Sequence, residues 1–446
     1  MAAVDIGTLK TRFIEKRAVI GIVGLGYVGL PLMLAATAVG FRVIGFDIDE
    51  PKVDGLNRGK SPLEHIGHAR ICRAIDQRLF EATADFRRIG EVDAVLICVP
   101  TPLGRHREPD LSYVEGTVES IAPALRAGQL VVLESTTYPG TTTEIVKPRI
   151  EARGFTSGRD IFIAYSPERE DPGNRDFETR QIPKVVGGDG RAALELACTL
   201  YDQFVVETVP VSSPETAEAV KLTENIFRAV NIALVNELKV VFQKMGIDIF
   251  EVVDAAKTKP FGYMPFYPGP GLGGHCIPID PFYLTWRAKE FGIATKFIEL
   301  AGEINTSMPA HVVQATAEAL DRRSGRGLNG ARVLLAGIAY KKNVDDMRES
   351  PALVIWALLA ARGAIVEYHD PLVPVIPPTR EHSDLTGRRS RPLDEATLGA
   401  ADVVIIVTDH DRLDLASIGR HTGLVIDTRN AMQKLEGETA AEVRPA

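Results

Sequence analysis

The sequence has little cysteine and lacks long apolar runs. Its four cysteines, Cys72, Cys98, Cys198 and Cys276, are far apart and include no CxxC pair, so a reducing compartment is indicated and a zinc pattern is not. We predict no metal site. No stretch reaches about 18 uninterrupted apolar residues, and residues 1–17 lack the apolar core of a signal peptide. These absences predict a cytoplasmic protein without a membrane partner.

An excess of positive charge is also absent. The formal net charge is −8, from 51 Lys and Arg against 59 Asp and Glu, which argues against a nucleic-acid groove as the main feature. A small anionic ligand remains compatible with this charge, because a local basic pocket can coexist with a negative total. The 446 residues exceed one ordinary core, so two or three domains are expected.

A nucleotide-binding pattern opens the chain. The apolar run 18–23 leads into GLGYVG, which places Gly24, Gly26 and Gly29 in GxGxxG spacing, and the next apolar run, 42–46, ends in Asp47. Glycines permit a tight turn and close approach to a pyrophosphate, and a terminal acid accepts hydrogen bonds from ribose hydroxyls. We therefore predict NAD rather than NADP. A flavin site or a non-binding α/β unit is the alternative.

Five further apolar runs predict a sheet of about eight strands: 93–99, 129–134, 161–165, 184–188 and 204–210. Polar turns that contain Thr101, Thr136 and Glu168 follow three of them. Ligands sit beyond the carboxyl ends of strands in open α/β sheets, so we expect these turns to border the cofactor. The alternatives are helix caps for the threonines and a solvated turn for Glu168.

The middle of the chain changes character. Residues 214–245 contain no Gly or Pro after the first residue, and they predict one long helix with Lys221 and Asn225 on the same face. An exposed polar pair is the alternative for these two. A short helix at 247–258 and a helical stretch at 282–308 are also expected.

Between those helices lies a loop, GPGLGGHCIPIDP, over residues 269–281. Glycine lets a ligand approach the backbone closely, and proline restricts the backbone of the loop. Such a loop would let Cys276 act as a nucleophile near Asp280. From this loop alone, a small buried thiol is the favoured interpretation. The preceding aromatic residues of 260–270 suit either stacking on a base or sugar or core filling.

A second α/β pattern occupies residues 331–427. It has no GxGxxG, but Lys341, Lys342 and Arg348 follow its first strand, where positive charge suits a diphosphate. Residues 376–394 are interpreted as a mobile surface excursion, and the last 15 or so residues as frayed. The predicted fold is α/β, with two Rossmann-like doubly wound domains joined by a helical middle domain with one long central helix. The expected domains are 1–211, 212–325 and 326–446.

The chain resembles the nucleotide-sugar 6-dehydrogenases, which oxidise UDP-sugars. The matching motifs span almost the whole chain: GLGYVGLP (24–31), VPTP (99–102), STTYPGTT (135–142), SPERED (166–171), KLTEN (221–225), GPGLGGHCIPIDP (269–281) and RESPA (348–352). The resemblance implies a four-electron oxidation of a primary alcohol to a carboxylate with two NAD molecules in succession. It also implies a homodimer formed through the central helix.

The resemblance carries a role for each matched residue. Cys276 would attack the aldehyde, and Lys221 and Asn225 would steady the oxyanions. Asp280, with Thr136 through a water, would relay protons, and Glu168 would position the hydrolytic water. The implied cofactor contacts are Gly24, Gly26, Tyr27, Val28, Gly29, Asp47, Thr101, Thr136 and Arg348. The implied substrate contacts are Glu168, Lys221, Asn225, Tyr267, Gly273 and Lys341.

One departure concerns the loop after Pro167. UDP-glucose enzymes usually place Phe or Leu after SPE and then a further glutamate, whereas this chain has Arg169 and residues 170–174, EDPGN. Together with HCIPIDP, this loop is similar to the UDP-N-acetylhexosamine branch, particularly the UDP-N-acetylglucosamine 6-dehydrogenases of bacterial surface-polysaccharide pathways. UDP-glucose and UDP-N-acetylmannosamine oxidation are the alternatives within the family. A single-step alcohol dehydrogenase and a nucleotide-sugar sensor are the alternatives outside it.

Overall fold

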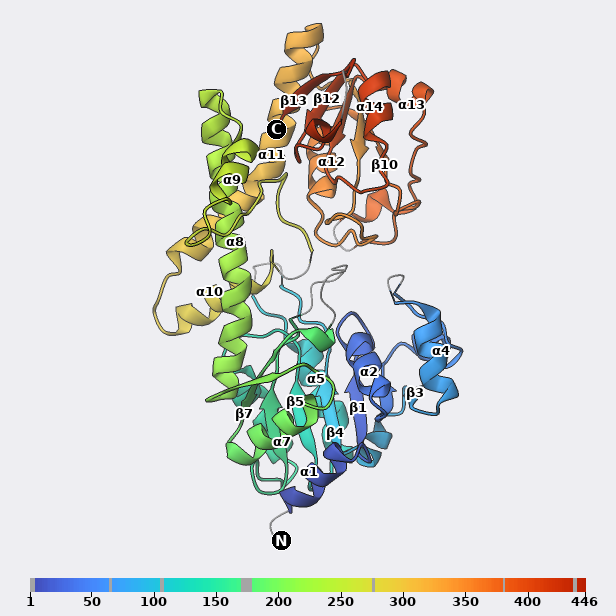
Figure 1. Ribbon diagram of the computed structural model, residues 1–446, viewed down its shortest axis with the longest axis vertical. Helices are drawn as coiled ribbons and strands as arrows, with labels where there is room; N and C mark the ends of the chain where they lie inside the picture. The colour runs from blue at the N-terminus through green and yellow to red at the C-terminus, as the bar shows by residue number, and fades with distance from the viewer. Residues whose placement is uncertain are drawn as a thin grey trace. The chain divides into compact units, whose positions relative to one another are not determined.

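The computed structural model of the chain describes residues 5–63, 66–104, 108–169, 179–274, 277–379, 382–435 and 439–446. The chain divides into two units (Figure 1). Unit 1 holds residues 1–224 and 282–293, and unit 2 holds residues 225–281 and 294–446. Among the described residues, no helix has the length and apolarity needed to cross a membrane.

Unit 1 contains an eight-stranded sheet with the order β3-β2-β1-β4-β5-β6-β7-β8. The pairing is parallel except between β6 and β7, which run antiparallel. The strands are β1 (Val19–Val23), β2 (Arg42–Phe46), β3 (Phe80–Thr83), β4 (Ala94–Ile97), β5 (Leu130–Leu133), β6 (Phe162–Tyr165), β7 (Lys184–Gly188) and β8 (Thr208–Val211). The expected strand at 204–210 is wrong in its bounds, because Phe204 and Val205 are buried in the turn after α7 (Arg191–Tyr201).

Helices cover both faces of this sheet, which is why its strands are almost continuously apolar. Ile20 and Leu96 face a core shared with α1, α2, α4 and α7, and Val95 and Ile97 face a second core shared with α5 and α6. The helices of unit 1 that precede α7 are α1 (Ile6–Ile14), α2 (Gly29–Ala38), α3 (Glu50–Asn57), α4 (His68–Asp76), α5 (Ser112–Ile121) and α6 (Lys147–Glu151).

The long helix has the bounds that the sequence predicts, α8 (Pro214–Met245), and α9 (Ile249–Ala256) follows it. The single helical stretch expected at 282–308 is wrong. The chain forms α10 (Asp280–Glu290) and α11 (Lys296–Ser324), separated by Gly292 with φ +71°. Pro309 lies inside α11 rather than ending it, because the buried side chains of Met308 and Val312 anchor the helix on either side of the missing N–H.

Unit 2 contains a parallel five-stranded sheet with the order β10-β9-β11-β12-β13. Its strands are β9 (Arg332–Ala336), β10 (Ile365–His369), β11 (Val403–Ile406), β12 (Leu424–Asp427) and β13 (Glu442–Pro445), and its remaining helices are α12 (Pro351–Ala361), α13 (Glu395–Ala400) and α14 (Leu415–His421). The mixed α/β fold with two sheets and a helical central region confirms the predicted fold class.

Two predictions about mobility in unit 2 are wrong. The last residues are not frayed, because β13 pairs with β12 and Ala446 is fully buried. The described part of 376–394 is not a loose excursion, since Ile376 N–H donates to the Arg388 carbonyl at 2.9 Å and Val375 bridges Arg389. Backbone pairing holds both stretches, and composition does not reveal such pairing.

Candidate active site

The glycine loop after β1 combines a tight turn with an open approach. Gly24 has φ +94°, and a Cβ there would lie 2.7 Å from the Cys98 carbonyl oxygen. A Cβ on Gly29 would lie 2.0 Å from the Gly24 carbonyl oxygen, whereas a Cβ on Gly26 would meet nothing within 4 Å. Gly24 and Gly29 therefore allow close packing, and Gly26 leaves space for a ligand beside the backbone.

The helix α2 begins directly at this loop. Its N-cap, Val28, offers no capping side chain. Leu30 N–H donates to the Gly26 carbonyl at 3.1 Å and Pro31 has no N–H, so what this helix start offers an anion is chiefly the positive end of the helix dipole. Tyr27 and Val28, both predicted cofactor contacts, lie between the open position at Gly26 and this helix start. The loop thus fits the pyrophosphate of a dinucleotide.

Asp47, at the end of β2, lies beside the same loop. One carboxylate oxygen of Asp47 accepts from Leu25 N–H at 2.9 Å and from the Lys52 ammonium at 2.9 Å, and the other accepts from Asp49 N–H at 3.1 Å. Sequence reasoning missed Lys52. A basic residue in the first turn of the helix after the terminal acid was the available signal.

The turns after β4 and β5 are joined to each other. The Thr101 hydroxyl donates to the Thr136 carbonyl at 2.7 Å, and Ser135 donates to the Val99 carbonyl at 2.7 Å. The buried Tyr283 donates to the Thr101 carbonyl at 2.6 Å. The structure therefore brings Thr101 and Thr136 together, and Tyr283, which sequence reasoning missed, holds them.

The loop after β6 carries Glu168. Its carboxylate accepts from the Arg169 backbone N–H at 2.7 Å. The Arg169 guanidinium donates to Glu224 on α8 at 2.6 Å and to the Pro183 carbonyl at 2.7 Å. Residues 170–178, the rest of the departure from the UDP-glucose pattern, lie outside the described residues. Arg169, the first residue that departs from the UDP-glucose pattern, thus ties the described part of the loop to α8.

The polar residues of α8 are buried rather than solvated. Lys221 is 8% exposed, and its ammonium forms no ion pair or hydrogen bond in the part of the chain that the structure describes. Asn225, one helical turn later, is 4% exposed, and its side-chain amide donates to Asp280 at 2.5 Å. This burial argues against the exposed polar pair. Polar side chains that are buried in this way are more typical of a functional site.

The predicted nucleophile, Cys276, lies outside the described residues. Burial raises the pKa of the Cys98 thiol well above its ordinary value, and burial also raises the pKa of Cys198. Both thiols therefore stay protonated near neutral pH, and neither suits nucleophilic attack.

The described part of the cysteine loop packs against the RESPA motif in unit 2. Gly274 N–H donates to the Arg348 carbonyl at 3.0 Å. A Cβ on Gly273 would lie 2.6 Å from the Tyr340 Cβ and 3.0 Å from the Glu349 carbonyl oxygen. Gly273, a predicted substrate contact, therefore has a packing reason of its own.

Three other predicted contacts lie in unit 2. Lys341 belongs to the turn after β9, and the Arg348 guanidinium donates to Asp346 at 2.6 Å. The Tyr267 hydroxyl donates to Asp254 of α9 at 2.6 Å. The positive charges of Lys341 and Arg348 suit the diphosphate of a nucleotide. The exposed ring of Tyr267 suits stacking on a base or a sugar.

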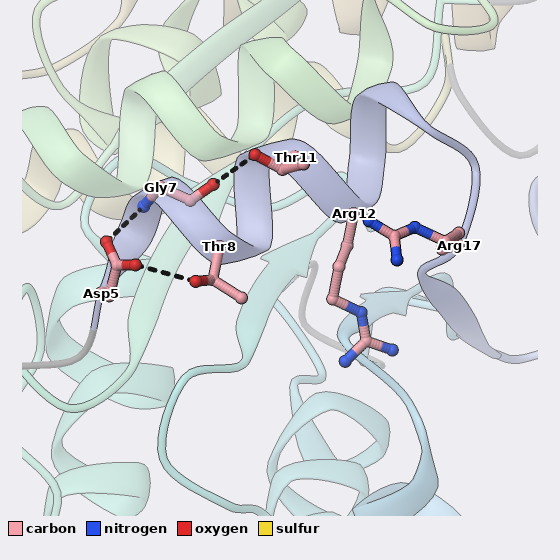
Figure 2. Close-up of a pocket in the computed structure, with 6 residues that line it drawn as sticks. All are labelled: Asp5, Gly7, Thr8, Thr11, Arg12 and Arg17. Atoms are coloured by element: carbon pink, nitrogen blue, oxygen red, sulfur yellow. Dashed lines mark hydrogen bonds between the residues drawn. The ribbon is translucent and has the colours of Figure 1, made fainter.

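A surface hollow on α1 is lined by Asp5, Gly7, Thr8, Thr11, Arg12 and Arg17 (Figure 2). Asp5 accepts hydrogen bonds from Gly7 N–H at 2.9 Å and from the Thr8 hydroxyl at 2.8 Å. Arg12 pairs at 2.7 Å with Asp93, which precedes β4. The hollow thus lies at the amino ends of the strands, opposite the edge where α/β sheets bind ligands, and it is not the cofactor site.

The mostly parallel sheet of unit 1, the parallel sheet of unit 2 and the glycine loop define a dinucleotide-binding α/β protein. Three models of one family match the chain in order: the NAD binding domain at residues 18–205, the central domain at 215–307 and the UDP binding domain at 334–434. The chain belongs to the UDP-glucose/GDP-mannose dehydrogenase family. It is an NAD-dependent UDP-sugar dehydrogenase, as the sequence predicts.

Relatives that are named for different substrates resemble the chain. A UDP-N-acetyl-D-glucosamine 6-dehydrogenase of Pseudomonas aeruginosa is 36% identical over 395 residues, which cover 88% of this chain and 90% of that protein. An NDP-N-acetyl-D-galactosaminuronic acid dehydrogenase of Ralstonia nicotianae is 34% identical over 422 residues, 92% of this chain and 95% of that protein. The solved UDP-D-ManNAc dehydrogenase of Pyrococcus horikoshii has a TM-score of 0.85 at 32% identity, covering 96% of this chain and 98% of that chain.

Proposed function

We propose that the protein oxidises the C6 alcohol of UDP-N-acetylglucosamine to a carboxylate, making a precursor for surface polysaccharide. The observation that carries the substrate choice is the 36% identity to the Pseudomonas aeruginosa enzyme of that name. The SPEREDPGN and HCIPIDP motifs agree with it. UDP-N-acetylmannosamine is the second candidate, because the Salmonella typhi enzyme named for it is 34% identical.

The residues predicted from the motifs supply the groups that the reaction needs. NAD held at the glycine loop would supply the acceptor for each of the two hydrides that leave C6, one NAD molecule after the other. The Cys276 thiolate adds to the aldehyde carbon, and the lysine ammonium of Lys221 and the amide of Asn225 stabilise the resulting oxyanion. Asp280 orients the Asn225 amide and accepts protons. Glu168 positions the water that replaces sulfur on the carbonyl carbon.

A substrate panel tests this function. Purified protein with NAD and UDP-N-acetylglucosamine should form two NADH per sugar consumed, and faster turnover of UDP-N-acetylmannosamine or UDP-glucose would overturn the substrate assignment. Cys276→Ser should stop acid formation, because serine is a poorer nucleophile and the aldehyde then lacks its covalent route. Full acid formation by that variant would exclude the covalent mechanism.

We also propose that the protein is a homodimer formed through α8. Four apolar side chains recur along this helix at intervals of seven, seven and four residues and are 46–63% exposed: Phe227, Leu234, Val241 and Met245. Such a row on one helix face is typical of packing against a second copy of the same helix.

The oligomeric state of two aspartate variants tests the dimer. Leu234→Asp should yield monomers in light scattering at micromolar concentration, because it buries a charge in the proposed interface. Arg228→Asp, about one third of a turn round the same helix, is the control and should remain dimeric. A Leu234→Asp variant that stays dimeric would show that this row is not the interface.

A further inference from the structure

A buried ion pair lies next to the loop that carries Glu168. Lys184, the first residue of β7, donates from its ammonium to Glu134, at the end of β5, with an Nζ–Oε2 distance of 2.7 Å. Their side chains are 4% and 0% exposed. The predicted chemistry uses neither residue.

The lysine also reaches the loop itself. Its ammonium donates to the Pro167 carbonyl at 3.2 Å and lies 3.9 Å from a carboxylate oxygen of Glu168. The Tyr201 hydroxyl donates to the other oxygen of Glu134, and the Tyr201 ring lies 5.1 Å from the ammonium. The ion pair with Glu134 thus holds Lys184 in one position, from which it contacts two consecutive residues of the loop.

Glu168 is held from a second direction. Its Oε1 accepts from the Arg169 N–H at 2.7 Å, while Lys184 faces its Oε2. One residue earlier, the Ser166 hydroxyl donates to the Val185 carbonyl at 2.8 Å. The loop is therefore fastened to β7 at both Ser166 and Pro167, and the carboxylate that follows has a fixed direction.

Stability alone gives a weak reason for this arrangement. Replacing a whole buried ion pair by apolar residues of similar volume is often neutral or stabilising, because two charges no longer need to leave water. Burial opposes the charge on Lys184, but Glu134 and Glu168 outweigh it and raise the pKa of the lysine. The cation is therefore permanent near neutral pH, and its position is what it contributes.

We propose that Lys184 is the positioning residue for Glu168, fixed in turn by its ion pair with Glu134. The inference rests on the proposed function, in which Glu168 directs the hydrolytic water. In that step the water oxygen bonds to the thioester carbon, the carbon–sulfur bond breaks with its electron pair on sulfur, and Glu168 takes the water proton. Lys184 keeps the carboxylate aimed, so it serves hydrolysis rather than hydride removal.

The test separates these two stages in the full-length protein. The double variant Glu134→Met/Lys184→Met removes the whole pair, and Tyr201→Phe, the control, removes one hydrogen bond but leaves the ammonium beside Glu168. The double variant should release a rapid burst of two NADH per chain at a rate within about twofold of the parent. Its steady-state rate should then fall about 10–100-fold, the scale expected for a misplaced catalytic group.

Intact-mass spectrometry after acid quench should show the acyl adduct accumulating in the double variant and not in Tyr201→Phe. If hydrolysis keeps its parental rate, or the first hydride step slows as much as hydrolysis, the proposal is overturned. Should the double variant not fold, Glu134→Gln/Lys184→Gln removes the cation while keeping side chains that can hydrogen-bond each other.

Hydrogen exchange distinguishes this proposal from the proposed function. Peptides that cover residues 166–169 should lose protection in the double variant and keep it in Tyr201→Phe, whether or not any UDP-sugar is turned over. A parent enzyme without NADH formation would refute the proposed function alone. Unchanged protection in the double variant would refute the positioning role alone.

Discussion

The first turn of the sheet in unit 1 and the first turn of the sheet in unit 2 are built alike. Gly24 follows β1 with φ +94°, and its Cβ position lies 2.7 Å from the Cys98 carbonyl oxygen. Gly337 follows β9 with φ +78°, and its Cβ position lies 2.2 Å from the Thr408 carbonyl oxygen. In both sheets a glycine lets the chain turn against the end of the neighbouring strand.

The two turns differ two residues later. Gly26 faces open space, whereas Ala339 is fully buried and its carbonyl accepts from the Thr408 hydroxyl at 2.6 Å. Unit 1 therefore leaves its backbone open to a phosphate. Unit 2 closes the same position, so we expect side chains, with Lys341 as the predicted one, to supply anion recognition there.

The acid after the second strand shows the same contrast. Asp370 follows β10, and its carboxylate accepts from Ile338 N–H at 2.7 Å, from Leu372 N–H at 2.8 Å and from His410 at 3.2 Å. Its side chain is 0% exposed. Asp47 keeps 7% exposure and a lysine partner. The acid in unit 2 is structural, whereas the acid in unit 1 remains able to bind a ligand.

The largest expected effect is a loss of stability when Asp370, the fully buried acid of unit 2, is replaced. Asp370→Asn should destabilise unit 2 by about 3–5 kcal/mol, because the amide cannot accept all the hydrogen bonds of the buried carboxylate and leaves His410 without its partner. Urea unfolding followed by the fluorescence of Trp356, in a Trp286→Phe background, would measure it. Asp47→Asn should instead raise the NAD KM with little change in stability. Equal losses of stability in the two variants would break the comparison.

The next effect is a loss of NAD affinity when Gly26, which faces open space, is replaced. Gly26→Val should weaken NAD binding about 100-fold, or ~2.7 kcal/mol, because the side chain fills the space beside the backbone, while the melting temperature changes little. Calorimetric titration with NAD would check the affinity. Ala339→Gly, the matched change in unit 2, should leave NAD affinity unchanged. A Gly26→Val variant with parental affinity would place the pyrophosphate elsewhere.

The smallest effect is a pH dependence of opposite sign in the two units. Burial raises the pKa of Glu218 on α8 to about 7, against hydrogen bonds from Thr142 and Gly140. Since the folded pKa exceeds the unfolded one, the stabilisation is present below about pH 4.5 and is lost as the pH rises through about 7. Burial opposes the charge on Asp370, but His410 and the backbone donors outweigh burial and lower the pKa of this carboxyl. The stabilisation from Asp370 is therefore lost as the pH falls below about 4.

Unfolding of unit 1 between pH 5 and 8 would measure this dependence through Trp286, in a Trp356→Phe background. Glu218→Gln should flatten the decline towards neutral pH, because glutamine does not titrate. An unchanged slope in that variant would assign the decline to other groups.

Local patterns predict much of this structure. Six of the strands of unit 1 (β1, β2, β4, β5, β6 and β7), the bounds of α8, and the placing of Asp47 beside the glycine loop follow from runs of apolar residues and from glycine spacing, whereas no apolar run predicts β3. The predicted helix across 282–308 fails at Gly292, which takes a left-handed conformation. Burial of the side chains around Pro309 then carries α11 past a residue that normally ends a helix.

By itself the sequence determined the class of protein, because strand periodicity, glycine turns and strand-end acids act over a few residues and leave a local trace. Tertiary structure alone decided that β13 completes the sheet of unit 2, that Tyr283 holds Thr101, and that Lys184 faces Glu168. Each of these contacts joins segments far apart in the chain, where the partner of a polar group depends on how the sheets and helices pack.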